Sequence, residues 1–525
     1  MTLSRISRRQ LLAGAGGFAL LTGLAPARLL ASAPQLQGNP FTLGVAAGDP
    51  HPDGFVIWTR LAPQPLAEHS GMPMTTFPVQ WEVAEDEHFA RVVQHGVHIA
   101  RPELGHSVHV EVAGLAPQRP YWYRFHLADA SSQTGRARTA PAAGSLPGQL
   151  RIAVAGCQHY ESGLFTAYRH LANDGDFDAL LHYGDYIYEG PAGKGVTLDG
   201  QRILVREHVG DEIYDLADYR RRYAQYKGDA DLQAAHAAVA FIPSFDDHEV
   251  DNNWAGDYDQ DGVPVPAFVL RRAAALQAWY ENMPVRRAQM VRPDGLTMHR
   301  RLDYGRLLRV HVLDTRSQRS NQFCSKPGQP HCRTDHGGPD SMLGAAQEHW
   351  LAQGLDTPAH WNLLAQQVVC MPLDRRRPQA SEAVLSDDGW DGYPQARARL
   401  ARAISQQGKG NVVIATGDVH QHYVGHLPAT PDDLASPALA SEFVCTSISS
   451  NGDGSLLRRG QEHYLSNNPH ISFNNAQRGY QVFEVSAQRW TTELKVVDRV
   501  QSAGGALSTV ARFQVEPGRP QPQRL

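Results

Sequence analysis

Short apolar segments alternate with helical patterns from about residue 150 onwards, and this alternation constrains the fold more than any other feature. Such segments, several of them rich in β-branched residues, are typical of strands buried on both faces of a sheet. They cover residues 151–155, 179–182, 239–243, 307–313, 362–369, 412–415 and 443–446. Amphipathic segments predict helices at 216–226, 270–281 and 396–405. The sequence therefore predicts an α/β domain.

Five of the predicted strands run directly into side chains that can bind metals or phosphate. In an α/β sheet, functional residues collect just beyond the carboxyl ends of the strands. One Asp at such a position often caps the next helix, but five polar endings in succession are hard to explain as caps. The residues that follow these strands are Cys157, Asp185 with Tyr188, Asp247 with His248, Arg316, and Asp418 with His420.

The mixture of residue types at these strand ends predicts two unlike metal ions. A carboxylate has two oxygens and can bridge a pair of cations. A thiolate or a phenolate is a poor ligand for calcium but a good ligand for ferric iron. Carboxylate oxygens suit hard divalent ions such as calcium. Cys157 and Tyr188 therefore favour ferric iron at one position, and the aspartates favour a harder ion at the other.

Several of these residues have a structural alternative. Cys157 could be a buried thiol without a ligand role, and Tyr188 could pack between a strand and a helix. Only one of the neighbours Asp246 and Asp247 needs to face a metal, and the other could be a turn residue. The sequence alone leaves these alternatives open.

The polar residues around these aspartates also leave their roles open. His248 could be a metal ligand, a phosphate donor or a general acid, and Glu249 could orient it. Arg316 could be an ordinary ion-pair partner, although an arginine beyond a strand end suits bidentate phosphate binding. His422, two residues beyond His420, could equally be a surface residue.

The region from residue 40 to 140 has a different pattern of short alternating strands with turns between them. The segment around Tyr121 resembles the tyrosine corner of a fibronectin-III or immunoglobulin-like sandwich. Four histidines fall on predicted strands without clustering as metal ligands: His95, His98, His106 and His109. We predict a structural β-sandwich domain here, followed by a linker at 139–148.

The first 33 residues predict a signal peptide. Arg8 and Arg9 stand before an apolar segment interrupted by glycines, and residues 31–33 (Ala-Ser-Ala) form a small-x-small cleavage site. This pattern is typical of twin-arginine export, and the segment is too short for a stable membrane anchor. The alternative is a chance Arg-Arg pair in an ordinary secretory signal. Either interpretation predicts a periplasmic or secreted protein, and the first implies the twin-arginine export machinery as a partner.

The chain contains five cysteines, and an oxidising compartment permits disulfides. Cys324 and Cys332 lie in a segment rich in Gly, Pro and Ser and could form a disulfide across it. Cys370 and Cys445 each end an apolar segment, which favours buried free thiols. The formal net charge of −5 gives no indication of specific nucleic-acid binding.

The motifs themselves resemble a known family. Gly184-Asp185-x-x-Tyr188 resembles a signature block of purple acid phosphatases and related calcineurin-like metallophosphoesterases. Together with Cys157, residues 245–254 (FDDHEVDNNW), 313–317 (LDTRS) and 417–420 (GDVH), it is similar to the PhoD-like alkaline phosphatase and phosphodiesterase family. The resemblance implies a four-layer α-β-β-α sandwich, placed at 150–515, behind the smaller β-sandwich domain.

The resemblance also implies cofactors and ligands. Cys157, Tyr188 and His420 would hold Fe3+, Asp185 would bridge, and Asp247 and Asp418 would hold Ca2+. Asp247 stands where the broader calcineurin-like pattern has Asn, and Asp418 stands where it has His. Both changes add an anionic oxygen and favour calcium over zinc or a di-iron centre.

The implied activity is phosphoesterase activity on a phosphate ester substrate. We expect direct hydrolysis by a metal-activated hydroxide, with His248 and Arg316 binding phosphate oxygens or protonating the leaving group. One alternative is a phospholipase D-type phosphodiesterase on the same scaffold. The other is a non-catalytic exported binding module.

Overall fold

The computed structural model describes residues 38–525, except 199, 293–294, 325–331, 335–338, 357 and 408–410. The predicted signal peptide at 1–33 therefore lies outside the described residues. Within the described part of the chain, no helix is both long and apolar enough to cross a membrane. Cys324 and Cys332 form a disulfide, as predicted, while Cys157, Cys370 and Cys445 are free and buried.

The N-terminal region forms two antiparallel sheets that pack around an apolar core. One sheet contains β1 (Val45–His51), β2 (Gly54–Arg60) and β5 (Ser107–Val112). The other contains β3 (Phe77–Ala84), β4 (Val92–Ala100), β6 (Pro120–Leu127), β7 (Ala130–Ser131) and β8 (Gly135–Arg138). The backbone N–H of Ala116 donates to the hydroxyl of Tyr121 at 2.9 Å, which is the contact expected of a tyrosine corner.

The first sheet of the larger region begins with three parallel strands: β9 (Leu150–Ala155), β10 (Ala179–His182) and β13 (Phe241–Pro243). Antiparallel strands extend it beyond β9: β21 (Ile471–Val485), β22 (Trp490–Val497), β23 (Leu507–Glu516) and β24 (Arg519–Arg524). Gly48 of β1 pairs with Phe241 of β13, so the N-terminal domain continues this sheet on its other side.

The second sheet has its own parallel centre, formed by β15 (Leu308–Val312), β16 (Trp361–Ala365), β17 (Val412–Thr416) and β19 (Ala438–Val444). Two antiparallel strands flank it, β14 (Arg300–Tyr304) and β18 (His422–Pro428). The long strand β21 joins the sheets, because its first residues pair with β18 and its last residues pair with β9.

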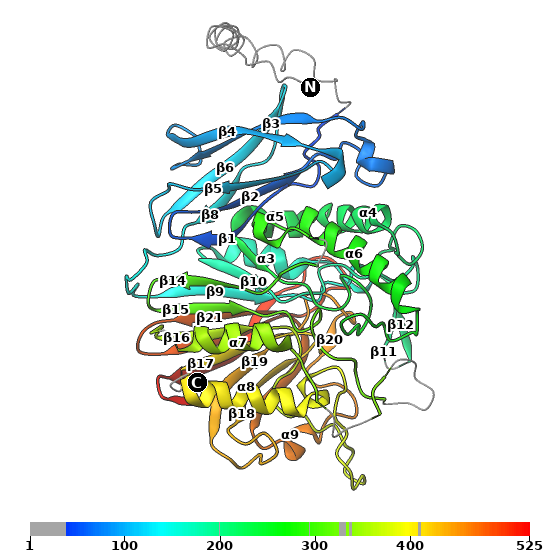
Figure 1. Ribbon diagram of the computed structural model, residues 1–525, viewed down its shortest axis with the longest axis vertical. Helices are drawn as coiled ribbons and strands as arrows, with labels where there is room; N and C mark the ends of the chain where they lie inside the picture. Colours follow the sequence, from blue (N-terminus) through cyan, green and yellow to red (C-terminus); the bar gives the residue numbers. More distant parts are fainter. Residues whose placement is uncertain are drawn as a thin grey trace, which may run out of the picture.

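Helices cover the outer faces of both sheets and complete a four-layer α-β-β-α sandwich (Figure 1). On the side of the first sheet lie α3 (Thr166–Asp174), α4 (Leu216–Lys227), α5 (Ala230–Ala238) and α6 (Val265–Asn282). On the side of the second sheet lie α7 (Gly344–Leu355) and α8 (Pro394–Gln407). Short elements in the connecting segments are β11 (Val196–Leu198), β12 (Gln201–Ile203), β20 (Gly454–Ser455) and α9 (Tyr464–Asn467).

Two local differences from the sequence prediction have physical reasons. The apolar segment predicted as a strand at 362–369 pairs only as far as Ala365, because the chain then leaves the sheet while staying buried. The antiparallel strands from β21 to β24 were not predicted, because their alternating and partly exposed residues lack the continuous apolar signal of a central strand.

Candidate metal centre

The parallel strands of both sheets end at the same edge of the sandwich and bring the predicted ligands together. Among the described residues, three groups of side chains have ligand atoms that all lie within 4.8 Å of one another. The groups are Cys157, Asp185 and His420; Asp185, Asp247 and His248; and Asp246, Asp247 and Asp418. Asp185 and Asp247 each belong to two groups, so the three groups form one continuous centre.

Tyr188 completes the group around Cys157. Its hydroxyl donates to Oδ2 of Asp185 at 2.8 Å and lies 3.2 Å from Nε2 of His420. Nε2 of His420 and Oδ2 of Asp185 are 3.8 Å apart. The structure thus places a thiol, a phenol, an imidazole and a carboxylate around one point.

The aspartate side of the centre contains one more carboxylate than the predicted ligand set. The sequence left open whether Asp246 or Asp247 faces the centre, and both do. Oδ1 of Asp185, Oδ2 of Asp246 and Oδ1 of Asp247 are buried without a hydrogen-bond partner. Unsatisfied buried carboxylate oxygens are costly, so this donor set fits cations that the centre would bind.

Four of the predicted ligands have a left-handed backbone, which is uncommon for residues other than glycine. The φ angles are 52° at Cys157, 54° at Asp185, 66° at Asp418 and 56° at His420. Unfavourable backbone conformations of this kind persist where the surrounding structure enforces them, and they gather at functional sites. The left-handed residues turn the chain sharply at the strand ends and direct these side chains into the centre.

Glycines next to the ligands allow two of these loops to approach Tyr183. A Cβ atom added to Gly156 would lie 2.4 Å from the Tyr183 ring, and one added to Gly417 would lie 2.0 Å from it. The Tyr183 hydroxyl donates to the carbonyl of Thr446 at 2.8 Å and anchors the ring. The pairs Gly-Cys and Gly-Asp in the sequence therefore mark the positions where the loops pack on one tyrosine.

The metal-free centre concentrates negative charge in a buried space. Burial raises the pKa of Asp185, Asp246 and Asp418 well above the usual range, and nearby carboxylates such as that of Asp247 raise it further. Burial also raises the pKa of the Cys157 thiol, as does the charge of Asp185. Cations would reverse both effects by stabilising the ionised forms.

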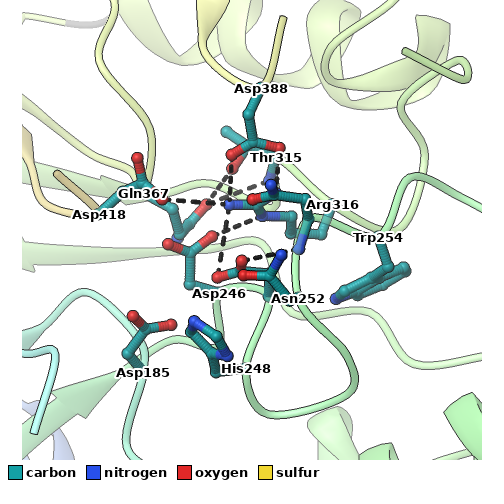
Figure 2. A network of polar contacts seen from close by, with 12 residues as sticks. Asp185, Asp246, His248, Asn252, Trp254, Thr315, Arg316, Gln367, Asp388 and Asp418 are labelled. Carbon is teal, nitrogen blue, oxygen red and sulfur yellow. Dashed lines mark hydrogen bonds and ion pairs between the residues drawn. The ribbon is translucent and has the colours of Figure 1, made fainter. Parts of the chain in front are cut away.

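Of the two roles that the sequence left open for Arg316, ion pairing and phosphate binding, the structure shows ion pairs with carboxylates. Arg316 is completely buried, and Nε donates to Oδ1 of Asp246 at 2.5 Å. Nη1 and Nη2 form a bidentate pair with Asp388 at 2.8 and 3.0 Å (Figure 2). Nη2 also lies 3.6 Å from oxygens of both Asp247 and Asp418. The guanidinium therefore contacts four carboxylates and holds the aspartate side of the centre in place.

Glu189 orients His248, whereas the sequence suggested Glu249 for this task. Nδ1 of His248 lies 2.7 Å from Oε2 of Glu189, and the His248 ring stacks on Tyr188 with centroids 4.1 Å apart. Glu249 instead accepts the backbone N–H groups of Asp185 and Asp246 at 3.1 and 2.7 Å. It ties two ligand loops together.

Other residues of the site carried little or no sequence signal. Ser450 contacts the Tyr188 hydroxyl at 2.8 Å, and Asn451 contacts Nδ1 of His420 at 3.1 Å. Both come from the segment after β19, which ends in small polar residues without a recognisable motif. His422, expected to be a possible surface residue, is completely buried at the start of β18.

Comparisons with known proteins identify the family of this chain. Residues 152–494 match the family model described as PhoD-like phosphatase, and residues 25–141 match the model of the PhoD-like phosphatase N-terminal domain. The chain belongs to the PhoD-like phosphatase family. It is 42% identical over 513 residues to alkaline phosphatase D of Bacillus subtilis (strain 168), covering 96% of this chain and 87% of the relative.

A solved structure of PhoD has a similar fold. It matches with a TM-score of 0.89 and 41% identity over 94% of this chain and 93% of that chain. This PhoD-like phosphatase is accordingly an enzyme, a phosphoric ester hydrolase, and the interpretation as a non-catalytic binding module is set aside. Its acidic and histidine clusters fit a metal-dependent phosphatase.

Proposed function

We propose that this enzyme is an exported phosphoesterase whose centre binds one ferric ion and calcium and hydrolyses phosphomonoesters, phosphodiesters or both. One observation carries the proposal: Cys157, Tyr188 and His420 lie around Asp185. Asp185 is also grouped with Asp247, which in turn is grouped with Asp246 and Asp418. The two sides of the centre differ in the chemistry of their ligands, as a pair of unlike metals requires.

Cys157, Tyr188 and His420 would hold the ferric ion, and Asp185 would bridge. Thiolate and phenolate ligands favour a trivalent ion that keeps both groups deprotonated. The buried Oδ1 of Asp185, which has no hydrogen-bond partner, is available as a second ligand atom while Oδ2 contacts Tyr188. This pair of oxygens supports the bridging role.

Asp247 and Asp418 would hold calcium, and the position of Asp246 adds it as a third candidate ligand. An all-oxygen set of carboxylates suits calcium. When bound, the cations supply Lewis acidity and lower the pKa of a water molecule, which serves as the nucleophile. Arg316 keeps the carboxylates apart in fixed positions by donating to Asp246 and Asp388.

His248 is the residue we propose to contact the substrate. Glu189 occupies its Nδ1, so Nε2 is the nitrogen left to donate to a phosphate oxygen or to the leaving group. Burial lowers the pKa of His248, but Glu189, Asp247 and Asp185 more than offset this and raise it well above the usual value. Glu189, the largest of these contributions, lies outside the proposed ligand set and would still favour a protonated imidazole, which can bind an anionic phosphate, when cations neutralise the aspartates.

The experiment combines metal analysis with activity. We expect protein isolated from its native compartment to contain iron and calcium, to lose activity on chelation, and to regain it with calcium. Recovery with zinc but not with calcium would contradict the assignment of the aspartate side. Assays of a phosphomonoester and of phosphatidylcholine side by side decide between phosphatase activity and a phospholipase D-type activity.

A further inference from the structure

Arg478 lies in the middle of β21, the strand that joins the two sheets, and it belongs to none of the ligand groups of the metal centre. We propose that Arg478 is a positioning residue of the iron side, whose guanidinium holds His420 and the segment 447–450 where a ferric ion needs them. The inference rests on the proposed function, because it assigns a task at the same site.

The Arg478 side chain is buried without an anionic partner. The residue is 1% exposed, and among the residues that the structure describes its hydrogen-bond acceptors are carbonyl and hydroxyl oxygens only. Its Nε has no hydrogen-bond partner. Burying a charge among neutral groups is costly. A task at the neighbouring centre gives a reason for an arginine in this place.

The guanidinium connects the ends of two strands. Nη1 lies 3.0 Å from the carbonyl oxygen of His420, which follows β17, and 2.8 Å from the carbonyl oxygen of Ser450, which follows β19. Nη1 also contacts the hydroxyl of Ser447. Nη2 donates to the carbonyl of Ala476 on β21 itself. Arg478 thus ties three segments of the chain together.

The contact with His420 fixes an unfavourable backbone conformation. His420 has a φ of 56°, in the left-handed region that is uncommon for residues other than glycine. Its carbonyl oxygen also lies 3.4 Å from Nη2 of Arg458 and 3.3 Å from Oγ1 of Thr446. Because the peptide is held at this oxygen, the imidazole stays directed at the centre, with Nε2 3.8 Å from Oδ2 of Asp185.

The contact with Ser450 reaches the other two residues of the iron side. Oγ of Ser450 lies 2.8 Å from the Tyr188 hydroxyl and donates to the carbonyl of Cys157 at 2.7 Å. A shift of the segment 447–450 would therefore displace a partner of Tyr188 and of the Cys157 loop together. Arg478 acts on all three proposed iron ligands through these contacts.

A glycine makes room for the guanidinium on a further side. Gly454 in β20 has a φ of 75°, and a Cβ atom added to it would lie 2.6 Å from Nη2 and 2.8 Å from Nε of Arg478. Gly454 pairs with Gln477, the residue before Arg478 in β21. The chain that follows Ser450 therefore packs directly on the guanidinium.

The task requires the shape of an arginine and not only its charge. Arginine presents its donors in a rigid planar fork, whereas lysine carries a single ammonium on a flexible chain. Arg478→Lys keeps the charge but cannot reach His420, Ser447 and Ala476 at once. Partners that orient metal ligands typically contribute about 10- to 100-fold to metal affinity. We therefore expect Arg478→Lys to bind iron about 10- to 100-fold more weakly.

The N-terminal domain offers a matched control. Arg60 at the end of β2 is 2% exposed and belongs to none of the ligand groups of the centre. Its hydrogen-bond partners are also neutral: the carbonyls of Gly105 and Arg220, the side chain of Asn282 and the hydroxyl of Ser70. A lysine at position 60 therefore reproduces the cost of disturbing a buried guanidinium away from the metal centre.

The test removes iron from the full-length mature enzyme with increasing concentrations of a ferric chelator and records the visible charge-transfer band at saturating iron. We expect Arg478→Lys to release iron at about 10- to 100-fold lower chelator concentration and to shift the band. Arg60→Lys should also lose stability in urea, but it should keep the iron affinity and the band of the wild type.

Ser447→Ala is a milder variant that decides the question where Arg478→Lys does not fold. It removes a hydroxyl that contacts Nη1 of Arg478 and donates to the carbonyl of Ser450 at 3.0 Å. Loss of about one hydrogen bond should weaken iron binding by about fivefold.

Wild-type iron affinity and an unchanged band in Arg478→Lys, or in Ser447→Ala where the lysine variant does not fold, would overturn the inference. An equal loss of iron affinity in Arg60→Lys would also overturn it, because the effect would then be one of general stability. A wild type with neither iron nor the band would instead contradict the proposed ferric site, and the inference would fall with it.

Discussion

Replacing Tyr188 by Phe removes one oxygen atom and leaves the ring in place. The ring stacks on His248 with centroids 4.1 Å apart and meets His159 edge-on at 4.5 Å, and both contacts survive in the variant. The hydroxyl contacts Asp185 and Ser450 at 2.8 Å each and His420 at 3.2 Å. The change therefore isolates what the oxygen contributes.

Loss of these contacts should lower the free energy of unfolding of the metal-free protein. Each hydrogen bond contributes about 1 kcal/mol net, so losing three contacts should lower the free energy of unfolding by roughly 2–3 kcal/mol. In the metal-loaded enzyme the loss should be larger, because the phenolate would be a ligand of the ferric ion. Removing a residue that merely orients a ligand costs about 10- to 100-fold in activity, so we expect turnover to fall by more than about 100-fold.

The assay is the visible spectrum recorded with iron analysis. A ferric phenolate has a charge-transfer band, so the wild type should be coloured and Tyr188→Phe should lose or strongly shift the band. Ser450→Ala is the matched control, because it removes a hydrogen-bond partner of the Tyr188 hydroxyl but keeps the Tyr188 oxygen itself. This variant should retain the band. A colourless wild type with stoichiometric iron, or an unchanged spectrum and rate in Tyr188→Phe, would refute the reasoning.

Three further predictions concern Arg316, the buried Lys227 and the predicted signal peptide. Arg316→Lys keeps the charge but cannot form the bidentate pair with Asp388, so kcat should fall about 10- to 100-fold while KM stays the same; a rise in KM with unchanged kcat would indicate phosphate binding instead. Lys227→Met should stabilise the protein by about 1 kcal/mol at pH 7, because the buried ammonium has no hydrogen-bond partner. Burial, with the charge of Arg60, lowers the pKa of Lys227 in the folded state well below 10.5. The wild type therefore gains stability as the pH rises towards 10.5, and the stability difference between Lys227→Met and wild type should vanish there. Urea denaturation at several pH values measures this difference. Replacing Arg8 and Arg9 by Lys should leave precursor in the cytoplasm on cell fractionation, and normal export would argue for an ordinary secretory signal.

The sequence alone determined the fold class and most of the predicted ligands. Continuous apolar segments are typical of strands buried on both faces, and the carboxyl ends of parallel strands meet at one edge of a sheet. Cys157, Asp185, Asp247 and Asp418 all follow such strands directly. The convergence of Cys157, Asp185 and Asp247, which follow strands of one sheet, could therefore be inferred from the sequence, whereas their closeness to Asp418 depends on how the two sheets pack.

The stacking of the two sheets decided the contacts between loops that lie far apart in the chain. Arg316 follows β15 of the second sheet, yet it contacts Asp246 of the first sheet and Asp388 from another loop. Glu189 orients His248 from a loop 59 residues earlier, which no local pattern could indicate. Only the tertiary structure sets these distances, because they depend on the packing of the core between the sheets and on the path of β21 from one sheet to the other.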